Sequence, residues 1–254
     1  MIKRILLHSI PEHEWPVWLV PAVILMVFLL SGIIAYFYYF GAGFGRFDGT
    51  TYRPVSNRTL AKVEVGGTLF AIPQNFTRNR NSRRADVLEH IELHALLPNL
   101  IGYDKMLAEE FLRTDTTSSL LLLNIRAIDE KMPEKQRFDA IYAPYILGNG
   151  DSDSKQDGLQ NFRFADNSPY FNKQIFRAIA TGTNDKIGEQ NTLPPVFLCD
   201  KPNIASPTCE SRFPLGQTAR VNYRFKRIYL QDWKKIDAAV KELIRNFRAA
   251  ARTF

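Results

Sequence analysis

The chain has 254 residues, of which 23% are charged and 45% are hydrophobic, proportions that exclude wholesale disorder. No repeat with a period of about 20 to 50 residues is visible, which excludes solenoids and propellers. The formal net charge of +7 indicates an anionic partner, but it does not by itself choose among nucleic acid, lipid head groups and acidic proteins.

A transmembrane helix is the first predicted element. The stretch Trp15–Phe40 carries no charged side chain, and at ~1.5 Å per helical residue it is long enough to cross a hydrocarbon core of about 30 Å. Aromatic side chains prefer the membrane–water interface, where we expect Trp15, Trp18, Tyr36, Tyr38 and Tyr39. Small residues predict a contact with another membrane helix, and they are Ser31, Gly32 and Ala35.

The predicted topology is a single pass with the amino terminus in the cytoplasm. Basic residues on both sides leave the orientation undecided. They are Lys3 and Arg4 before the helix and Arg46, Arg53 and Arg58 after it. Long domains cross the membrane largely regardless of their charge, which favours a body outside the cytoplasm. The expected organisation is a tail at 1–14, a transmembrane helix at 15–40, a linker at 41–60 and one domain at 61–254.

An α+β body with a mostly antiparallel sheet is predicted after the linker. Lys62–Pro73 alternates around Gly66 and Gly67, which suit the tight turn of a β-hairpin because glycine accepts positive φ. Further strands are predicted at Ala85–Leu97, Ser119–Ile125, Gln160–Phe164, Gln174–Ala180, Pro195–Cys199 and Ala219–Phe225. Short helices are expected at Lys105–Leu112 and within Pro133–Leu147, where the helix ends near Pro144, and a solvated loop is expected at Gly148–Gly158.

Four arginines fall in one predicted loop, at Arg78, Arg80, Arg83 and Arg84. Guanidinium groups bind phosphate head groups and carboxylates through two parallel hydrogen bonds. The cluster is therefore either a contact site for a partner or a lipid, or simply a solvated loop.

The segment Ala85–Leu97 contains His90 and His94 together with Glu89 and Glu92. As a helix, it would place both histidines on one face, where they are able to bind a metal, although the order H-E-x-x-H of zinc peptidases is absent. As a strand, which its alternation favours, it presents His90, Glu92 and His94 on a polar outer face. We expect the strand, with no metal and no cofactor.

Cys199 and Cys209 are the only cysteines, and a turn-rich segment separates them. An isolated pair that a turn folds back together is typical of a disulfide in an oxidising compartment. Two unlinked buried thiols remain the alternative. A zinc site requires more ligands, and no histidine lies nearby in the sequence.

The clearest amphipathic helix of the body is predicted at Gln231–Ala251. Apolar residues recur there at helical spacing and are expected to pack on the sheet, namely Trp233, Ile236, Val240, Leu243, Ile244 and Phe247. The other face carries a basic stripe of Lys234, Lys241, Arg245 and Arg248. Such a stripe is either a solvated face or a docking site for an acidic partner or an anionic lipid.

The runs DGLQNFRF, SPYFNKQIFRAIA, VFLC, PTCE and VNYRFKRIYLQDWKKIDAAVKELI resemble a pattern of uncharacterised membrane-anchored proteins of proteobacteria. The resemblance covers the carboxy-terminal half and includes VEVGGTLFAIPQNF. It implies a bacterial inner-membrane location and a periplasmic domain in which Cys199 and Cys209 are paired. It transfers no catalytic residue to this chain.

The expected function is that of a non-catalytic accessory or scaffold subunit of an inner-membrane complex, in contact with other integral membrane subunits and with the bilayer. Respiratory, photosynthetic, secretion and envelope assemblies use such subunits. The alternative is a membrane-tethered periplasmic module that binds a ligand or a lipid, for which a large apolar pocket is the expected sign. An enzyme is less favoured because G-x-S-x-G, P-loop and dinucleotide-binding motifs are absent. Nucleic acid is not an expected partner outside the cytoplasm.

Overall fold

The computed structural model describes residues 18–39, 52–84, 86–128, 134–152, 158–179 and 193–253. The chain divides into two units, Met1–Gly49 and Thr50–Phe254, and each is described by itself. The predicted tail at 1–14, Trp15 and most of the predicted linker lie outside the described residues. Thr50–Phe254 is called the body below.

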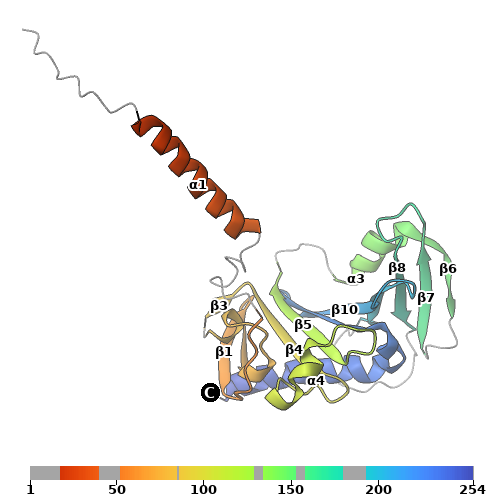
Figure 1. Cartoon of the computed structure of the whole chain (residues 1–254). Coiled ribbons are helices and arrows are strands. Elements are labelled where there is room, and N and C mark those ends of the chain that lie inside the picture. The colour runs from red at the N-terminus through yellow and green to blue at the C-terminus, as the bar shows by residue number, and fades with distance from the viewer. Residues whose placement is uncertain are drawn as a thin grey trace, which may run out of the picture. The chain divides into compact units, whose positions relative to one another are not determined.

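The first unit contains helix α1, Leu19–Tyr39, which has no acidic residue in its first turn and no basic residue in its last (Figure 1). Its described side chains from Val20 to Gly32 are exposed, among them Phe28 and Ser31, and so is Trp18 just before the helix. Ala35, Tyr36, Tyr38 and Tyr39 belong to α1, but their side chains are not among those described. Within the described residues we find no helix that combines the length and the apolar character needed to cross a membrane. The transmembrane span stays a prediction.

The body opens with a small sheet that confirms the predicted hairpin. Strands β1 (Leu60–Val65) and β2 (Thr68–Pro73) are antiparallel, and β3 (Val87–Leu88) pairs with β1 in parallel, in the order β2-β1-β3. Gly66 and Gly67 form the turn with φ of +56° and +75°, as a tight hairpin requires. Residues 52–59, part of the predicted linker, belong to the body: Tyr52 forms a β-bridge with Asn79, and the backbone N–H of Gln74 donates to the carbonyl of Thr59.

An eight-stranded antiparallel sheet forms most of the body, in the order β4-β5-β11-β10-β9-β8-β7-β6 (Figure 1). Its strands are β4 (His90–Leu96), β5 (Leu120–Ala127), β6 (Ile146–Ser152), β7 (Leu159–Phe164), β8 (Lys173–Ala178), β9 (Val196–Asp200), β10 (Thr208–Leu215) and β11 (Ala219–Lys226). The remaining described helices are α2 (Ala108–Leu112), α3 (Glu134–Arg137) and α4 (Trp233–Arg252). The predicted α+β class with a mostly antiparallel sheet and a carboxy-terminal helix is therefore confirmed.

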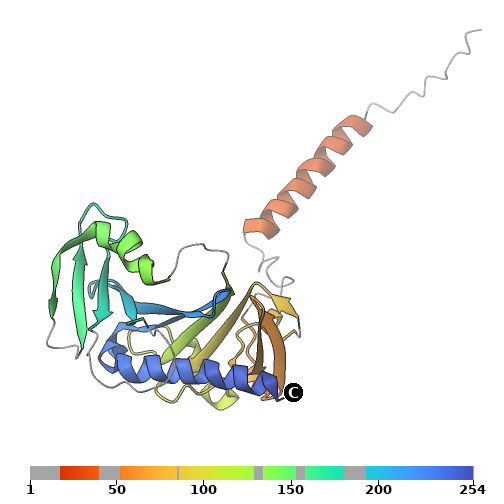
Figure 2. The ribbon, with the colours of Figure 1, turned by 180° about the vertical axis from the view of Figure 1, so that it is seen from behind.

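Helix α4 covers one face of this sheet, where it runs beneath the strands (Figure 2). Its predicted apolar side chains are buried, except Leu243, which is partly buried, and full burial of each large one stabilises the fold by roughly 1.5–3 kcal/mol. Near the start of α4 the Trp233 ring contacts Phe197 of β9, and near its end the Phe247 ring contacts Phe76 beside the hairpin. The helix thus joins the two sheets into one core.

A second, smaller apolar cluster lies at the β6–β9 end of the sheet. It joins strand residues such as Phe162, Ile175 and Leu198 to the turn that follows α3, Phe138–Tyr142. The Phe138 ring contacts Phe162 at 5.7 Å between centroids. Since Ile175 pairs with Leu198 and Phe162 across the strands, while Phe197 points to α4, this cluster lies on the face opposite α4.

Two strand predictions are corrected. The predicted loop Gly148–Gly158 is wrong in its first part, because residues 148–152 belong to β6 and pair with β7 around an irregularity between Leu147 and Asp151. Residues 153–157 lie outside the described residues. Strand β10 was not expected at all, since Pro214 and the preceding turns obscure its alternation, yet it pairs with β9 and β11. In both cases pairing with a neighbouring strand stabilised extended backbone in a segment whose local composition favours turns.

Candidate functional site

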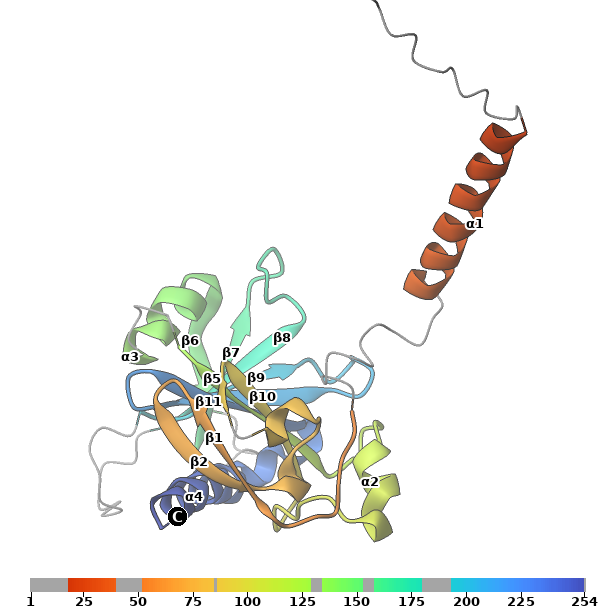
Figure 3. The same ribbon diagram turned by 90° about the vertical axis from the view of Figure 1, so that its left-hand side faces the viewer.

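The predicted arginine loop is only partly a free basic surface. Arg78 forms an ion pair with Glu92 at 3.5 Å and lies over the Tyr52 ring, and Arg83 donates to the backbone oxygen of Arg53 at 2.8 Å. Arg80 and Arg84 are exposed. Two members of the cluster therefore hold the start of the body in place, and two face solvent (Figure 3 shows this region around β1 and β2).

The basic stripe of α4 is interrupted by acidic partners. Lys241 donates to Asp237 at 2.7 Å, and Arg245 forms an ion pair with Glu242 at 2.5 Å. Asp237 is buried and also accepts from the Tyr223 hydroxyl at 2.8 Å. Lys234 lies beside the Trp233 ring, and Arg248 is half-buried. The stripe offers less unpaired charge than its sequence predicts.

The disulfide between Cys199 and Cys209 is present and fully buried. The two residues are direct partners in register on β9 and β10, with their Cα atoms 4.0 Å apart. The intervening turn brings the strands together as expected, whereas the pairing itself depends on β10, which the sequence did not predict. Neither cysteine of the chain is free.

The segment with the two histidines is a strand, as its alternation favours, and the helical alternative is wrong. Four residues along a strand place His90 and His94 about 13 Å apart, too far to share one metal ion. His90 is exposed, but His94 is completely buried, which corrects the expectation of a polar outer face at this position. Rings from three other segments enclose it, those of Tyr52, Tyr103 and Phe111.

Burial, assisted by the nearby Arg78 guanidinium, lowers the pKa of His94 from 6.5 to about 3. A histidine whose pKa is lower in the folded state binds fewer protons there, so its contribution to stability is lost as the pH falls below about 6.5. We expect the protein to lose about 2 kcal/mol of unfolding free energy between pH 6.5 and pH 5. Denaturant titrations across this range test it. His94→Phe should flatten this dependence and His90→Phe should not; an equal slope in His94→Phe would contradict the assignment.

The face of the sheet opposite α4 carries a polar surface that the sequence analysis missed. Because partners in register share a face, Arg126 lies beside His90 and Arg220, and Asn222 lies between Asn124 and Arg212. Arg224 is on the same side of β11 as Arg220. We call this surface the arginine face and define it as His90, Asn124, Arg126, Arg212, Arg220, Asn222 and Arg224. Two acidic residues lie on the same side of the sheet, Glu92 beside Asn124 and Glu210 beside Arg224.

Both ends of the arginine face are covered by other elements. Along the row that contains Arg224, the next strand partner is Glu210, and the partners then become apolar at Leu198 and Ile175, which pack with Phe138–Tyr142. In the other direction the same row ends at His94 under its aromatic rings. Among the described residues, the polar surface is thus the part of this sheet face that lies between two packed ends, and Arg126 and Arg224 are exposed there.

Charge on the arginine face is incompletely neutralised. Arg126 and Arg224 are exposed, and neither forms an ion pair with any residue that the structure describes. Glu210 lies opposite Arg224 in register without reaching it as an ion pair. Arg212 is held toward the second cluster by its contact with the Tyr142 hydroxyl at 2.5 Å. Surface cations without partners on an open sheet face are suited to binding an anionic surface.

A signal for this face was present in the sequence. Residues 219–226 read ARVNYRFK, in which Arg220, Asn222 and Arg224 alternate with buried side chains. This alternation predicts a strand with one polar side. The alternation does not show which strands pair with β11, and it is the pairing with β5 that places Arg126 next to Arg220.

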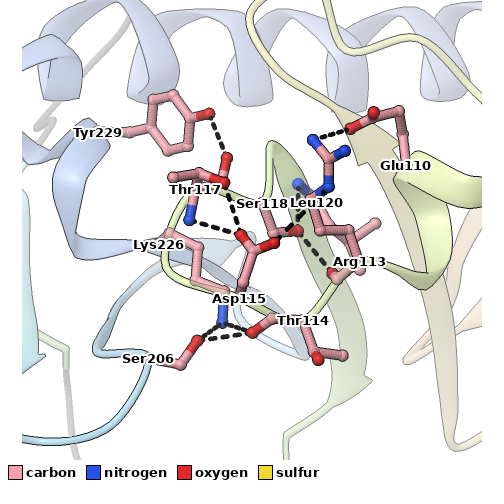
Figure 4. A network of polar contacts seen from close by, with 10 residues as sticks. All are labelled: Glu110, Arg113, Thr114, Asp115, Thr117, Ser118, Leu120, Ser206, Lys226 and Tyr229. Atoms are coloured by element: carbon pink, nitrogen blue, oxygen red, sulfur yellow. Dashed lines mark hydrogen bonds and ion pairs between the residues drawn. The ribbon is translucent and has the colours of Figure 1, made fainter.

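A polar network around Asp115 is a second cluster of charged groups, but its members bind one another (Figure 4). Asp115 accepts from the hydroxyl and the backbone nitrogen of Thr117, at 2.6 and 2.8 Å, and these bonds lower its pKa. Lys226 donates to the carbonyl of Thr114 at 2.8 Å and to Ser206 at 2.5 Å. The network fastens the loop before β5 to the end of β11, and it is a structural element.

A mainly apolar groove of about 520 Å³ lies beside the end of β2, and its lining shares no residue with the arginine face. Its apolar lining includes Phe76, Leu100, Leu107 and Met106, which is 94% exposed. The polar residues Arg58, Asn75 and Asp104 also line it. Its volume is within the range of small-molecule sites.

Taken together, the fold and site define an α+β domain with an antiparallel sheet, one face under a helix and the other partly open. No family model matches the sequence, and no curated protein matches it significantly. The fold is similar to that of an immunity protein of the Stenotrophomonas maltophilia type IV secretion system, with a TM-score of 0.51 and 16% identity over 78% of this chain and 98% of that one. The iron-regulated outer membrane lipoprotein FrpD of Neisseria meningitidis gives a TM-score of 0.49 and 12% identity over 79% and 99%. The first likeness concerns the fold alone.

Proposed function

We propose that this chain is a non-catalytic accessory or scaffold subunit of a bacterial inner-membrane complex, and that its periplasmic body binds a partner protein through the arginine face. The observation that carries the proposal is the open part of the sheet face, where Arg126 and Arg224 are exposed and unpaired within the described residues. A structural role inside the body does not account for these two side chains, because neither forms an ion pair with another described residue.

The membrane anchor is part of the proposal and rests on the uncharged stretch Trp15–Phe40, within which α1 forms. Large apolar side chains of α1, such as Phe28 at 72% exposure and Leu25 at 62%, need a covering surface, and lipid supplies one. Ser31, Gly32 and Ala35 would receive a helix of another subunit. The Cys199–Cys209 disulfide supports an oxidising compartment such as the periplasm.

The chemistry of the described side chains supports binding over catalysis. Both cysteines are consumed by the disulfide, and His94 is enclosed by aromatic rings. Within the described residues, no group of three or more histidine, cysteine, aspartate or glutamate side chains is placed to hold a metal ion. The arginine face remains the most distinctive polar surface of the body.

The double variant Arg126→Glu, Arg224→Glu should lose its partner when the full chain is extracted in mild detergent and its co-purifying proteins are quantified by mass spectrometry. Reversing two contact charges is expected to lower recovery at least about tenfold. The variant should fold, because a glutamate at position 126 lies opposite Arg220.

A matched control carries the same charge change on α4, Arg248→Glu with Arg252→Glu, and should retain the partner. Both control arginines are in the last two turns of α4 and form no ion pair with described residues. Loss in the control with retention in the face variant would move the contact to the helix stripe and overturn the proposal.

A membrane-tethered ligand-binding module is the second candidate, and the apolar groove favours it. Leu100, Ile101 and Met106 would then contact an apolar ligand. Native mass spectrometry of the protein isolated from its membrane distinguishes the two functions. A bound small molecule that Leu107→Trp displaces would support the groove, whereas a protein of defined stoichiometry would support the scaffold.

A further inference from the structure

Three segments of the body meet at the groove beside the end of β2. The backbone N–H of Gln74 donates to the carbonyl of Thr59 at 3.0 Å. Because the two segments run antiparallel there, as β1 and β2 do, Arg58 and Asn75 lie next to each other beyond this bond. The carbonyl of Asn75 accepts from the backbone N–H of Tyr103 at 2.7 Å. The lining therefore combines the start of the body, the end of β2 and the segment before α2.

Two polar groups of this lining lack partners among the residues that the structure describes. Asn75 is only 6% exposed, and its Oδ1 atom accepts no hydrogen bond. Buried polar atoms are hydrogen-bonded in nearly all native structures, so this acceptor calls for a donor from outside the chain. Arg58 is exposed and forms no ion pair with a described residue. The groove thus offers an acceptor and a cation beside an apolar surface.

Gly102 allows the amide of Asn75 to lie in the lining. A Cβ atom at position 102 would come within 2.6 Å of Asn75 Nδ2 and 3.1 Å of the Phe76 ring. A larger residue would therefore displace both groups. Burial of an acceptor without a partner lowers stability, so close packing of the amide is better explained by a ligand than by the fold.

We infer that the groove binds the carboxyl terminus of a partner polypeptide that ends in an apolar residue. Its last side chain packs against Phe76 and Leu107, and its terminal carboxylate pairs with Arg58. A backbone N–H of the peptide donates to Asn75 Oδ1. Guanidinium groups bind carboxylates through two parallel hydrogen bonds, and capture of a terminal carboxylate is a recurrent mode of peptide recognition. This inference rests on the second candidate function, a binding module, and names its ligand class; it does not involve the arginine face.

The polar groups of the lining favour a peptide over a lipid. A peptide carries an N–H donor close to its terminal carboxylate, which matches the neighbouring Asn75 and Arg58, whereas an acyl chain offers no donor. Asp104 also lines the groove, and its charge balances that of Arg58. A lining without net charge does not attract an anionic bilayer. Met106, 94% exposed, adds a flexible apolar side chain that adapts to the side chain of a peptide.

The test uses the full chain in phosphatidylcholine nanodiscs, so that no detergent competes for the groove. The probes are two mixtures of fluorescent hexapeptides that end in apolar residues, one with a free carboxylate and one with a carboxyl-terminal amide. Binding is read by fluorescence anisotropy against empty nanodiscs. The free carboxylate should raise affinity about tenfold, as a charge-assisted pair does. Arg58→Gln should abolish this difference, because only the carboxylate form interacts with the Arg58 charge.

Two further variants locate the binding. Arg84→Gln is the matched control and should keep the carboxylate preference, since Arg84 is exposed and does not line the groove. Leu107→Trp should fill the groove and weaken binding of both mixtures at least about tenfold. Arg58→Gln keeps the test decisive if Leu107→Trp fails to fold, because the Arg58 side chain is exposed.

Equal affinity of the wild-type protein for the two mixtures would overturn the inference, and so would a carboxylate preference that persists in Arg58→Gln. Binding that Leu107→Trp leaves unchanged would place the peptide elsewhere. Dodecanoate serves as the lipid-like probe. If dodecanoate binds, Leu107→Trp prevents it and the peptides do not bind, the binding module survives and the peptide is wrong. Failure of the peptides and dodecanoate alike overturns both.

Discussion

Phe197→Ala should destabilise the body by about 3–5 kcal/mol, the largest effect expected of any single substitution considered for this protein. The Phe197 side chain is completely buried, and its ring contacts those of Tyr223, Phe225 and Trp233 at 5.7–6.5 Å between centroids. It therefore joins β9, β11 and α4. Truncation removes this contact and leaves a cavity between the sheet and the helix, which rigid strands do not close.

Thermal and denaturant unfolding of the full chain measures this effect, which corresponds to a midpoint lowered by roughly 10 °C or more in a domain of this size. Phe171→Ala is the matched control, because Phe171 is 51% exposed and loses little on truncation. Similar losses in the two variants would show that α4 does not pack on the sheet as described.

The double substitution Cys199→Ala, Cys209→Ala should cost roughly 3 kcal/mol of unfolding free energy. The disulfide closes a loop between residues ten positions apart and so restricts the unfolded chain. It also lies in the main core, where both sulfurs are buried against neighbouring strands. Its loss should weaken the pairing of β9 with β10, through which strands β8, β7 and β6 are joined to the rest of the sheet.

Reduction supplies the internal control for the cysteine pair. A reducing agent should lower the unfolding midpoint of the wild-type protein toward that of the double variant and should leave the variant unchanged. A wild-type protein that is insensitive to reduction after complete unfolding and refolding would contradict a stabilising role for the disulfide.

Features that depend on neighbours along the chain were accessible from the sequence. Gly66 and Gly67 predicted the hairpin, because positive φ is a local requirement of its turn. The spacing of Ile236, Val240 and Ile244 predicted α4, because helical periodicity is local as well. The alternation around His90 gave a strand for the same reason. The boundaries of these elements differ from the predictions by only a few residues.

Features that depend on contacts between distant segments were not accessible in the same way. His94 has the alternation of a solvated position, but Tyr52 and Phe111 come from elsewhere in the chain to cover it. Asp237 lies within the apolar stripe of α4, where Tyr223 and Lys241 satisfy its carboxylate. Strand β10 was identified only in the structure, where it pairs with β9 on one side and β11 on the other. Pairing on both sides outweighs the presence of Pro214.

The sequence by itself determined the uncharged segment, the α+β class, the hairpin and the amphipathic helix, since each follows from the period and chemistry of consecutive residues. Only the tertiary structure decided which arginines share a surface. In the sequence, 93 residues lie between Arg126 and Arg220, yet strand order and register place the two side by side. Whether a sheet face is open or covered depends on which elements pack over it, and packing is a property of the whole chain.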